Sequence, residues 1–271
     1  MIEFEALKGL DEPRLPTYSR SYLGMSGVGG ECDRKTLLSW RWTKKTNVPA
    51  RVQRIFDMGH MLEADIVAKL ESLPDVEVQY TGEGQLEFIA IEGHWKGHPD
   101  GIIRVGGVSY LLEIKTHKDS NFKKLLKDGV EKGHPAHYDQ MQIYMNFDTT
   151  PSQAIYIAEN KDNCEYYVEV VEIDFNRIES LLERMREILH ATHLPPRIGT
   201  NKSNYFKCKM CEYSDVCFEK KQIEVNCRTC NSLRVCPEGQ FACAKQDVFL
   251  TLEDQMKGCS EYQLDGEYFT L

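Results

Sequence analysis

The chain has 271 residues and a formal net charge of −9, with 41% hydrophobic and 28% charged residues. This length can bury a full core in one domain with small appendages, and the composition is ordinary for a globular protein. No apolar run approaches the ~20 residues of a membrane span. Residues 1–5 are acidic where a signal peptide is basic and then apolar. We therefore expect an intracellular, cytoplasmic protein with no membrane partner.

Turn residues and apolar spacing predict the first elements of the chain. Residues 1–30 are expected to be irregular, because Pro13, Pro16 and a glycine-rich stretch interrupt any long element. A short helix is expected over 34–43. A longer helix is expected over 53–71, where apolar side chains recur at helical spacing.

The middle of the chain shows the alternation and the turns of β-strands. Residues 76–91 are expected to form a hairpin that turns at 81–84, a Thr-Gly-Glu-Gly sequence. Two further strands, 101–105 and 108–114, flank the Gly106-Gly107 turn. The second of these strands is apolar enough for a buried position in a sheet.

The last elements alternate helix and strand before the composition changes. They are helix 119–129, helix 137–147, strand 154–158, strand 166–173 and the amphipathic helix 175–191. After Pro195-Pro196 the chain becomes cysteine-rich, with eight of its ten cysteines beyond Lys207. This order predicts an α/β fold with a mixed central sheet flanked by helices and a C-terminal cysteine-rich tail. We expect two parts, 1–222 and 223–271.

Asp100 and the run Glu113-Ile114-Lys115 are the residues with the clearest chemistry. Two carboxylates hold Mg²⁺ or Mn²⁺ through oxygen, and a metal held there stabilises charge on a phosphate and lowers the pKa of a water. A lysine beside them can orient or activate that water. Taken singly, Glu113 and Lys115 are equally typical of a solvated pair on a strand, and Asp100 is typical of a turn.

Four pieces of the chain, taken in order, resemble the PD-(D/E)XK nuclease superfamily and in particular its RecB-like exonucleases. They are Gly59-His60-Met61-Leu62-Glu63, Gly97-His98-Pro99-Asp100-Gly101, Glu113-Ile114-Lys115-Thr116 and Tyr138-Asp139-Gln140-Met141-Gln142-Ile143-Tyr144. The resemblance covers roughly residues 32–217 and implies a restriction-endonuclease-like core. The ordered set is far more specific than any single piece.

The resemblance implies a metal site and a catalytic lysine. Asp100 and Glu113 would bind the metal through their carboxylates, and the Ile114 carbonyl would be a further ligand. His60 would be an additional ligand, which suits Mn²⁺ better than Mg²⁺ because imidazole is a softer donor than oxygen. Lys115 would position the attacking water or the scissile phosphate.

The helical pieces carry supporting roles in this resemblance. Gln140 and Tyr144 lie one helical turn apart and share a face, from which they would orient the water, the lysine or the DNA backbone. Glu63 follows His60 by three residues and would face the same cavity. The alternatives are a helix-surface position for His60 and simple packing for Gln140 and Tyr144. No motif assigns a role to the remaining histidines near this region, His94, His98, His117, His134 and His137.

Ten cysteines in a reducing compartment indicate metal binding rather than disulfides. Cys208, Cys211 and Cys217 are one thiolate short of a four-coordinate set, and Cys32 stands alone just ahead of the first predicted helix. This pattern resembles the iron–sulfur subgroup of RecB-like nucleases, which includes AddB and the CRISPR-associated exonucleases. The resemblance implies a [4Fe–4S] cluster on these four cysteines that staples the two ends of the nuclease domain. Zinc on the same thiolates is the alternative.

A second group of cysteines follows in a compact C-x₂-C-x₅-C-x₆-C run. Cys227, Cys230, Cys236 and Cys243 supply four thiolates within a short segment, which predicts a tetrahedral zinc site whose folding is driven by the metal. The alternative is that one of them is unligated and the site incomplete. The cysteines that fit neither group, and are expected to be free thiols, are Cys164 and Cys259.

Two basic groups interrupt the acidic charge of the chain. Residues 34–54 contain seven Lys and Arg residues and no acid, and Lys118, Lys123, Lys124 and Lys127 follow the proposed catalytic lysine. They favour contacts with a DNA backbone that are independent of sequence, although two solvated faces would have the same composition. The tryptophans of the first group either stack on a base or pack in the core; they are Trp40 and Trp42.

Together these features predict a metal-dependent DNA exonuclease of a phage or bacterium, acting in recombination, repair or DNA end processing. A structure-specific endonuclease with the same active site is the enzymatic alternative. A DNA-binding adaptor that has kept the fold without the activity is the non-enzymatic alternative. Whether the chain forms a homo-oligomer or binds a recombination protein stays open.

Overall fold

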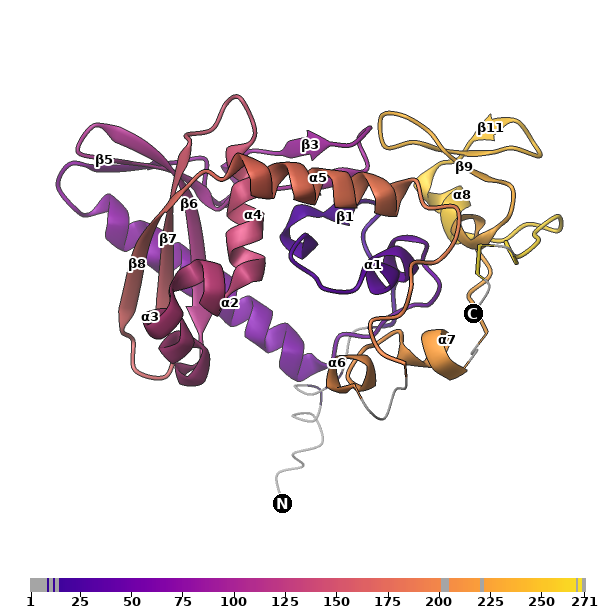
Figure 1. The fold of residues 1–271 in the computed structure, drawn as a ribbon, viewed down its shortest axis with the longest axis horizontal. Coiled ribbons are helices and arrows are strands. Elements are labelled where there is room, and N and C mark those ends of the chain that lie inside the picture. The colour runs from indigo at the N-terminus through magenta and orange to yellow at the C-terminus, as the bar shows by residue number, and fades with distance from the viewer. Residues whose placement is uncertain are drawn as a thin grey trace, which may run out of the picture.

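A five-stranded mixed sheet forms one end of the molecule in this computed structural model, which describes residues 9, 12, 15–200, 205–219, 222–266 and 268–269 (Figure 1). Its strand order is β2-β5-β6-β7-β8, with β6 and β7 parallel and the other neighbours antiparallel. The strands are β2 (Val76–Gln79), β5 (Gly101–Val105), β6 (Val108–His117), β7 (Gln153–Asn160) and β8 (Tyr166–Glu172). Residues 1–5, whose acidic composition is unlike that of a signal peptide, and Pro13, in the stretch expected to be irregular, lie outside the described residues.

The β5–β6 hairpin at the centre of the sheet is set by its turn. Gly106 and Gly107 have φ of 56° and 88°, the left-handed region that a two-residue hairpin turn requires at both positions. The register pairs Val105 with Val108 and Gly101 with Leu112. The predicted pair of strands is therefore confirmed, with β6 extending to His117.

Helices cover both faces of this sheet. Successive side chains of β6 point to opposite faces, and β6 has apolar side chains on both of them. Leu112 and Ile114 pack against Ile66 of α2 (Ala50–Glu71) in one apolar cluster. Leu111 belongs to the larger core on the other face, where the crossover from β6 to β7 runs. The crossover consists of α3 (Asp119–Gly133), which is kinked at Gly129, and α4 (Pro135–Met145). The predicted α/β class, with a mixed sheet flanked by helices, is confirmed.

A second, three-stranded sheet has the order β1-β4-β3. Its strands are β1 (Leu23–Gly24), β4 (Trp95–Gly97) and β3 (Phe88–Ala90). The hairpin predicted over 76–91 is wrong, because β2 pairs with β5 and β3 pairs with β4 in a different sheet. The expected turn contains a short 3-10 helix, η3 (Gly82–Gly84), that leads the chain from one sheet to the other.

Two helices connect this core to the rest of the molecule. The helix α1 (Asp33–Trp40) contacts α5 (Phe175–Leu189), which also packs on α4 and runs between the sheet and the tail (Figure 1). Asp174 caps α5 by accepting a hydrogen bond from the backbone of Arg177 at 3.0 Å. None of the described helices has both the length and the hydropathy to cross a membrane.

The cysteine-rich tail lies at the opposite end from the main sheet (Figure 1, yellow). A three-stranded sheet of order β11-β10-β9 forms its centre. Its elements, with the two short helices that precede them, are α6 (Phe206–Lys209), α7 (Ser214–Glu219), η4 (Cys227–Thr229), β9 (Leu233–Val235), β10 (Phe241–Cys243), β11 (Val248–Phe249) and α8 (Leu252–Met256). The cysteine-rich tail is thus present as expected, while the boundary between 222 and 223 stays a prediction.

Arg228 attaches this tail to the rest of the molecule. Its fully buried guanidinium donates hydrogen bonds to the carbonyls of Trp40 and Ser21 at 2.9 and 2.8 Å. It also lies over the Trp42 ring, 3.8 Å from the ring centroid. Trp40 and Trp42 are 2% and 1% exposed. Of the two alternatives for these tryptophans, core packing is therefore correct, and neither is available to stack on a base.

Candidate active site and cysteine clusters

Asp100 and Glu113 meet where β5 begins beside β6. The pairing of Gly101 with Leu112 places the residue before β5 next to the centre of β6. There the Asp100 carboxylate accepts a hydrogen bond from the backbone N–H of Ile114 at 2.7 Å. A side chain at Gly101 would lie 2.8 Å from the Gln79 carbonyl, so the glycine after Asp100 allows β2 to approach.

Lys115 lies between the two carboxylates. Its ammonium forms an ion pair with Glu113, lies 3.7 Å from Oδ2 of Asp100 and donates to the Ile114 carbonyl at 3.2 Å. Burial alone would lower the pKa of Lys115, but the charges of Asp100 and Glu113 outweigh burial and raise it above its ordinary value. Lys115 is therefore a cation at neutral pH.

Among Asp100, Glu113 and Lys115, Glu113 is the side chain whose ionised form is least well compensated by its surroundings. Its carboxylate is fully buried, and neither oxygen accepts a well-formed hydrogen bond from the described residues. Burial raises the pKa of Glu113 to about 8, although Lys115 opposes this shift. A buried carboxylate with a single cationic partner favours binding of a further cation, because its ionised form is otherwise poorly compensated.

The donor atoms at this point fit a divalent cation. Asp100 and Glu113 offer carboxylate oxygens and Ile114 offers its carbonyl, all within a region that the Ile114 N–H and the Lys115 ammonium tie together. Hard oxygen donors of this kind suit Mg²⁺ or Mn²⁺. Both ions stay predictions, as do the ligand roles of these three residues.

We expect the stability of the protein without added divalent cations to fall as pH rises from about 4.5 to about 8. The folded state keeps Glu113 protonated up to about pH 8, while the unfolded chain ionises it near the ordinary glutamate pKa of 4.5. The folded state therefore binds more protons than the unfolded state in this window, and stability decreases with pH. Denaturant midpoints measured across the window test this expectation.

Glu113→Gln is the matched control for this pH dependence. The variant has no carboxyl to titrate, so its stability should change less than that of the wild type over the same pH window. Mn²⁺ should stabilise the wild type more at the upper end of the window than at the lower end. Equal pH slopes for the two proteins would contradict the assignment of this titration to Glu113.

The helix α2 brings Glu63 to the carboxylates. Burial raises the pKa of Glu63, and the charge of Asp100 raises it further, while Lys115 and His60 act in the opposite direction. The half-buried Glu63 is thus within electrostatic range of Asp100, and its place in the active-site cavity stays a prediction. His60 is exposed on the same helix and reaches the site through its effect on Glu63, and its role as a ligand stays a prediction.

Gln140 and Tyr144 of α4 meet on the buried side of the site. The Gln140 amide donates to the Tyr144 hydroxyl at 3.4 Å, and both side chains are buried. Burial raises the pKa of Tyr144 and the charge of Glu113 raises it further, so the hydroxyl remains protonated. A side chain at Gly97 would lie 2.6 Å from the Tyr144 ring, so the glycine that opens the Asp100 piece makes room for this tyrosine.

Three histidines form a cluster on the same face of β6 as Lys115. Among the described residues, His117, His134 and His137 are the group of potential metal ligands whose atoms all lie within 4.8 Å of one another. The Tyr156 hydroxyl contacts His117 Nε2 at 2.9 Å and His137 Nδ1 at 2.8 Å. Burial lowers the pKa of His117 to about 4, and the neighbouring His134, Lys115 and Lys161 act in the same direction, so His117 is neutral at physiological pH.

No motif identified this cluster beforehand, although one signal was present. His117 follows Lys115 by two residues in a predicted strand, a spacing that places both side chains on one face. His134 and His137 come from the α3–α4 junction, which only the crossover brings to that face. The cluster forms a wall beside Lys115.

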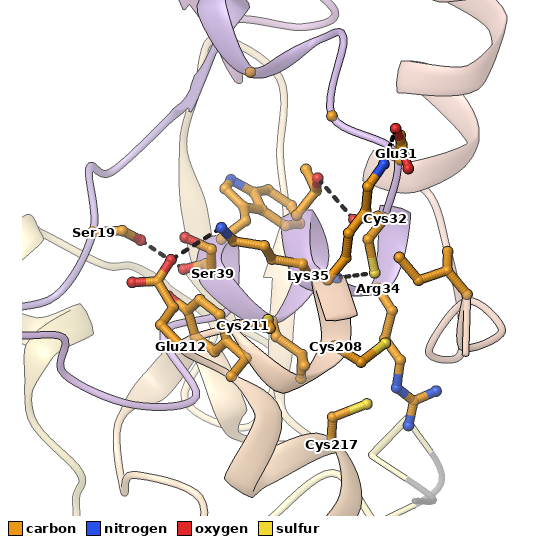
Figure 2. A pocket seen from close by; sticks show the side chains of 18 of the residues that line it. Ser19, Glu31, Cys32, Arg34, Lys35, Ser39, Cys208, Cys211, Glu212 and Cys217 are labelled. Carbon is orange, nitrogen blue, oxygen red and sulfur yellow. Dashed lines mark hydrogen bonds and ion pairs between the residues drawn. The ribbon is translucent and has the colours of Figure 1, made fainter. Parts of the chain in front are cut away.

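The first cysteine group lines a cavity of about 770 Å³ between α1, α6 and α7 (Figure 2). Cys32 caps the N-terminus of α1, and Cys208, Cys211 and Cys217 come from the tail side of the cavity. Burial raises the pKa of Cys208, and the thiols of Cys32 and Cys217 raise it further. The structure therefore places the distant Cys32 at the same cavity as the other three cysteines.

Charged side chains of both signs line this cavity, and the glutamates among them are Glu31 and Glu212. Arg34 and Lys35 line it, and Arg197 donates to the Cys217 carbonyl. The Nε atom of Arg34 is buried and makes no hydrogen bond with any described residue. An unpaired buried donor and four thiols suit an anionic thiolate-bound group, and iron–sulfur and zinc ligation both stay predictions here.

The β9–β10 hairpin separates two cysteines of the second group, since Cys243 pairs with Leu233 while the N–H of Cys236 donates to the Gln240 carbonyl. The thiols that act on Cys227 are those of Cys230, Cys259 and Cys243, and together with burial they raise its pKa to about 11. Cys236 lies elsewhere, with its carbonyl 2.7 Å from His94 Nε2. The exposed Cys259 was expected to be a free thiol.

Part of the first basic group is occupied within the protein. Arg34 and Arg41 are both 6% exposed, and Lys44 forms an ion pair with Asp215 at 2.8 Å. Arg34 donates to the Pro195 carbonyl at 2.9 Å, and Arg41 lies 3.7 Å from the Asp265 carboxylate. The prediction that the whole group contacts DNA is therefore wrong for these three side chains, because their charges serve contacts inside the protein. The second basic group is exposed and comprises Lys118, Lys123, Lys124 and Lys127.

Comparison with known proteins finds structural similarity at low sequence identity. No family model matches the chain, and no curated protein matches it. The crystal structure of SSO0001 shares 18% identity and a TM-score of 0.45, covering 75% of this chain and 89% of that one. An alkaline exonuclease from Laribacter hongkongensis, LHK-Exo, shares 20% identity and a TM-score of 0.47, with 62% and 86% covered. Its complex with dAMP shares 18% identity and a TM-score of 0.45, with 62% and 86% covered.

Proposed function

We propose that this chain is a divalent-cation-dependent deoxyribonuclease of the PD-(D/E)XK type, acting as a DNA exonuclease. The observation that carries this proposal is the buried Glu113 carboxylate, which shares Lys115 with Asp100. Burying two carboxylates and an ammonium together costs stability that a merely structural role does not repay. Perturbed charges of this kind are typical of catalytic sites.

A division of labour follows from the geometry. A divalent cation at Asp100, Glu113 and the Ile114 carbonyl would supply Lewis-acid stabilisation of the phosphate and a more acidic water. Lys115 remains cationic beside this point, so it would orient a water or hold a phosphate oxygen, both of which accept hydrogen bonds from an ammonium. Tyr144 keeps its proton and, with Gln140, would donate to the same water or to the DNA backbone.

The substrate we propose is DNA, bound without sequence preference. The exposed lysines on and before α3, which follows the strand of Lys115, would contact phosphates by charge alone. The protein would act in recombination, repair or end processing in a phage or bacterium. It would form a homo-oligomer or bind a recombination protein.

We further propose a [4Fe–4S] cluster at the first cysteine group. Four thiols from α1 and from the α6–α7 region share one cavity with buried and neighbouring cations. Ligation there would join segments that are far apart in the chain, and the cluster would serve the fold rather than the hydrolysis. Zinc on the same thiolates is the outcome that metal analysis of anaerobically purified protein would have to exclude.

The activity is tested with Mn²⁺ and linear single- and double-stranded DNA labelled at either end in turn. We expect shortening from an end that depends on added Mn²⁺ or Mg²⁺, and the product ladder gives the polarity. A covalently closed circle should remain intact, because an exonuclease needs an end. Cutting of the circle would identify a structure-specific endonuclease instead. Tight, metal-independent binding with no cleavage of any DNA would identify an adaptor and refute the proposal.

A further inference from the structure

The hairpin of β9 and β10 separates two of the cysteines in the tail. Its register pairs Cys243 with Leu233, while the N–H of Cys236 donates to the Gln240 carbonyl at 2.9 Å near the turn. Cys236 is therefore three residues from the level of Cys243, about 10 Å along the strands. Thiolates on one zinc lie about 2.3 Å from the metal and so within about 4 Å of one another. Cys236 and Cys243 cannot share a zinc while this hairpin is paired.

A different cysteine lies beside Cys227. The Cys227 thiol contacts the carbonyls of Asp254 and Lys257 at 3.3 and 3.4 Å, and Cys259 follows Lys257 by two residues. The thiols that influence Cys227 are those of Cys230, Cys259 and Cys243. The segment that carries Cys259 is thus the neighbour of the Cys227-x₂-Cys230 turn.

Backbone contacts hold these segments in place on both sides of Cys230. On one side, the N–H of Leu233 donates to the Cys230 carbonyl at 3.2 Å, which leads into the strand paired with Cys243. On the other side, Cys230 forms a β-bridge with Leu264, and the Thr229 hydroxyl lies 3.1 Å from that of Tyr262. The turn therefore lies between the Cys243 strand and the Cys259 segment.

We propose that Cys227, Cys230, Cys243 and Cys259 bind one zinc ion, and that Cys236 is a free thiol. Four thiolates satisfy the tetrahedral coordination of structural zinc. No three of the described cysteine sulfurs lie within 4.8 Å of one another, so binding would draw the four together. This inference does not depend on the nuclease proposal.

The site has a structural consequence for the whole molecule. Arg228 lies inside the Cys227-x₂-Cys230 turn and donates to the Gln255 side chain at 2.8 Å as well as to the carbonyl of Trp40. A zinc ion on this turn would join the anchor of the tail to the hairpin and to the segment after α8. We therefore expect the ion to keep the end of the chain in place beside Trp40.

Two single substitutions in the full-length protein test the ligand set. Wild type and Cys236→Ser should each carry about one zinc per chain at this site, whereas Cys259→Ser should lose it. Zinc and iron are both measured by mass spectrometry of the metals. Because neither substitution touches the first cysteine group, any zinc bound there adds equally to all three proteins, and the readout is the difference from the wild type. Loss of zinc from Cys236→Ser with retention in Cys259→Ser would overturn the proposal, as would a wild-type protein that binds no zinc when supplied with it.

Alkylation of the wild-type protein gives a second test that needs no variant to fold. Cys259 and Cys164 are both exposed, while Cys236 is half-buried. Exposure alone predicts that Cys259 and Cys164 react equally fast. With zinc bound, Cys259 should react far more slowly than Cys164 and become reactive when a zinc chelator is added. Equal reaction rates in zinc-loaded protein would overturn the proposal.

Discussion

Replacing Lys115 by alanine is expected to lower the rate of DNA cleavage by about 10³-fold, the effect typical of losing one preorganised electrostatic contact in an active site. The ammonium lies within 3.7 Å of Oδ2 of Asp100 and pairs with Glu113. It is the cationic side chain that the structure places between the two carboxylates. The measurement is the single-turnover rate on end-labelled linear DNA at saturating Mn²⁺.

Lys115→Ala should also change the stability of the protein in a way that separates folding from catalysis. At pH values above about 8, where Glu113 is ionised, it leaves the buried carboxylate without its partner, which costs about 3–5 kcal/mol for a buried pair. A divalent cation at the carboxylates would compensate for the lost ammonium. Mn²⁺ should therefore raise the Tm of Lys115→Ala more than that of the wild type, without restoring cleavage.

Lys257→Ala is the matched control for this experiment. Lys257 directly follows α8, is exposed and pairs with Glu253 of that helix, so its loss should leave both rate and stability close to those of the wild type. Cleavage by Lys115→Ala at the wild-type rate would remove the proposed mechanism. A slow variant that Mn²⁺ does not stabilise would show only that the fold is damaged.

Replacing Cys32 by serine is expected to remove the metal group of the first cysteine set and to destabilise the protein by about 5 kcal/mol. The figure is that of a cross-link closing a loop of more than 100 residues, since Cys32 lies across the cavity from Cys208 and Cys217 (Figure 2). Iron content, visible absorption and the denaturant midpoint of anaerobically purified protein measure the effect. The iron should be lost together with the colour.

Cys164→Ser provides the control for the loss of a thiol. Cys164 is exposed and belongs to neither cysteine group, so its substitution should leave the iron content and the midpoint unchanged. Full iron content in Cys32→Ser would show that Cys32 is not a ligand. A colourless wild type that contains zinc and no iron would show that zinc, and not an iron–sulfur cluster, joins the two distant segments at this site.

Much of the candidate site was predictable because it depends on local spacing. Glu113 and Lys115 are two residues apart in a strand, so they share a face whatever the rest of the fold does. Gln140 and Tyr144 are four apart in a helix and share a face for the same reason. Only the tertiary structure brings these two pairs together, because the α3–α4 crossover places the helix of the second pair beside the strand of the first.

The errors came from contacts between segments that lie far apart in the sequence. The pattern over 76–91 indicated two strands correctly but not their partners, because any neighbouring strand can satisfy an edge of a sheet. The basic residues near α1 have the composition of a DNA-binding group, yet Arg34 and Arg41 are buried. Composition does not show which face of an element another part of the chain will cover.

The cysteines show the same division most clearly. The close spacing of Cys227 and Cys230 was enough to indicate a metal site, because two thiolates separated by two residues can reach one ion. Which thiols join them depends on the register of β9 with β10, which places Cys236 about 10 Å from Cys243, and on the return of the chain that brings Cys259 to Cys227. The sequence by itself determined the chemistry and the faces of single elements, since both depend on neighbours along the chain. Only the tertiary structure decided which elements meet, because strand pairing and burial are set by segments that are distant in sequence.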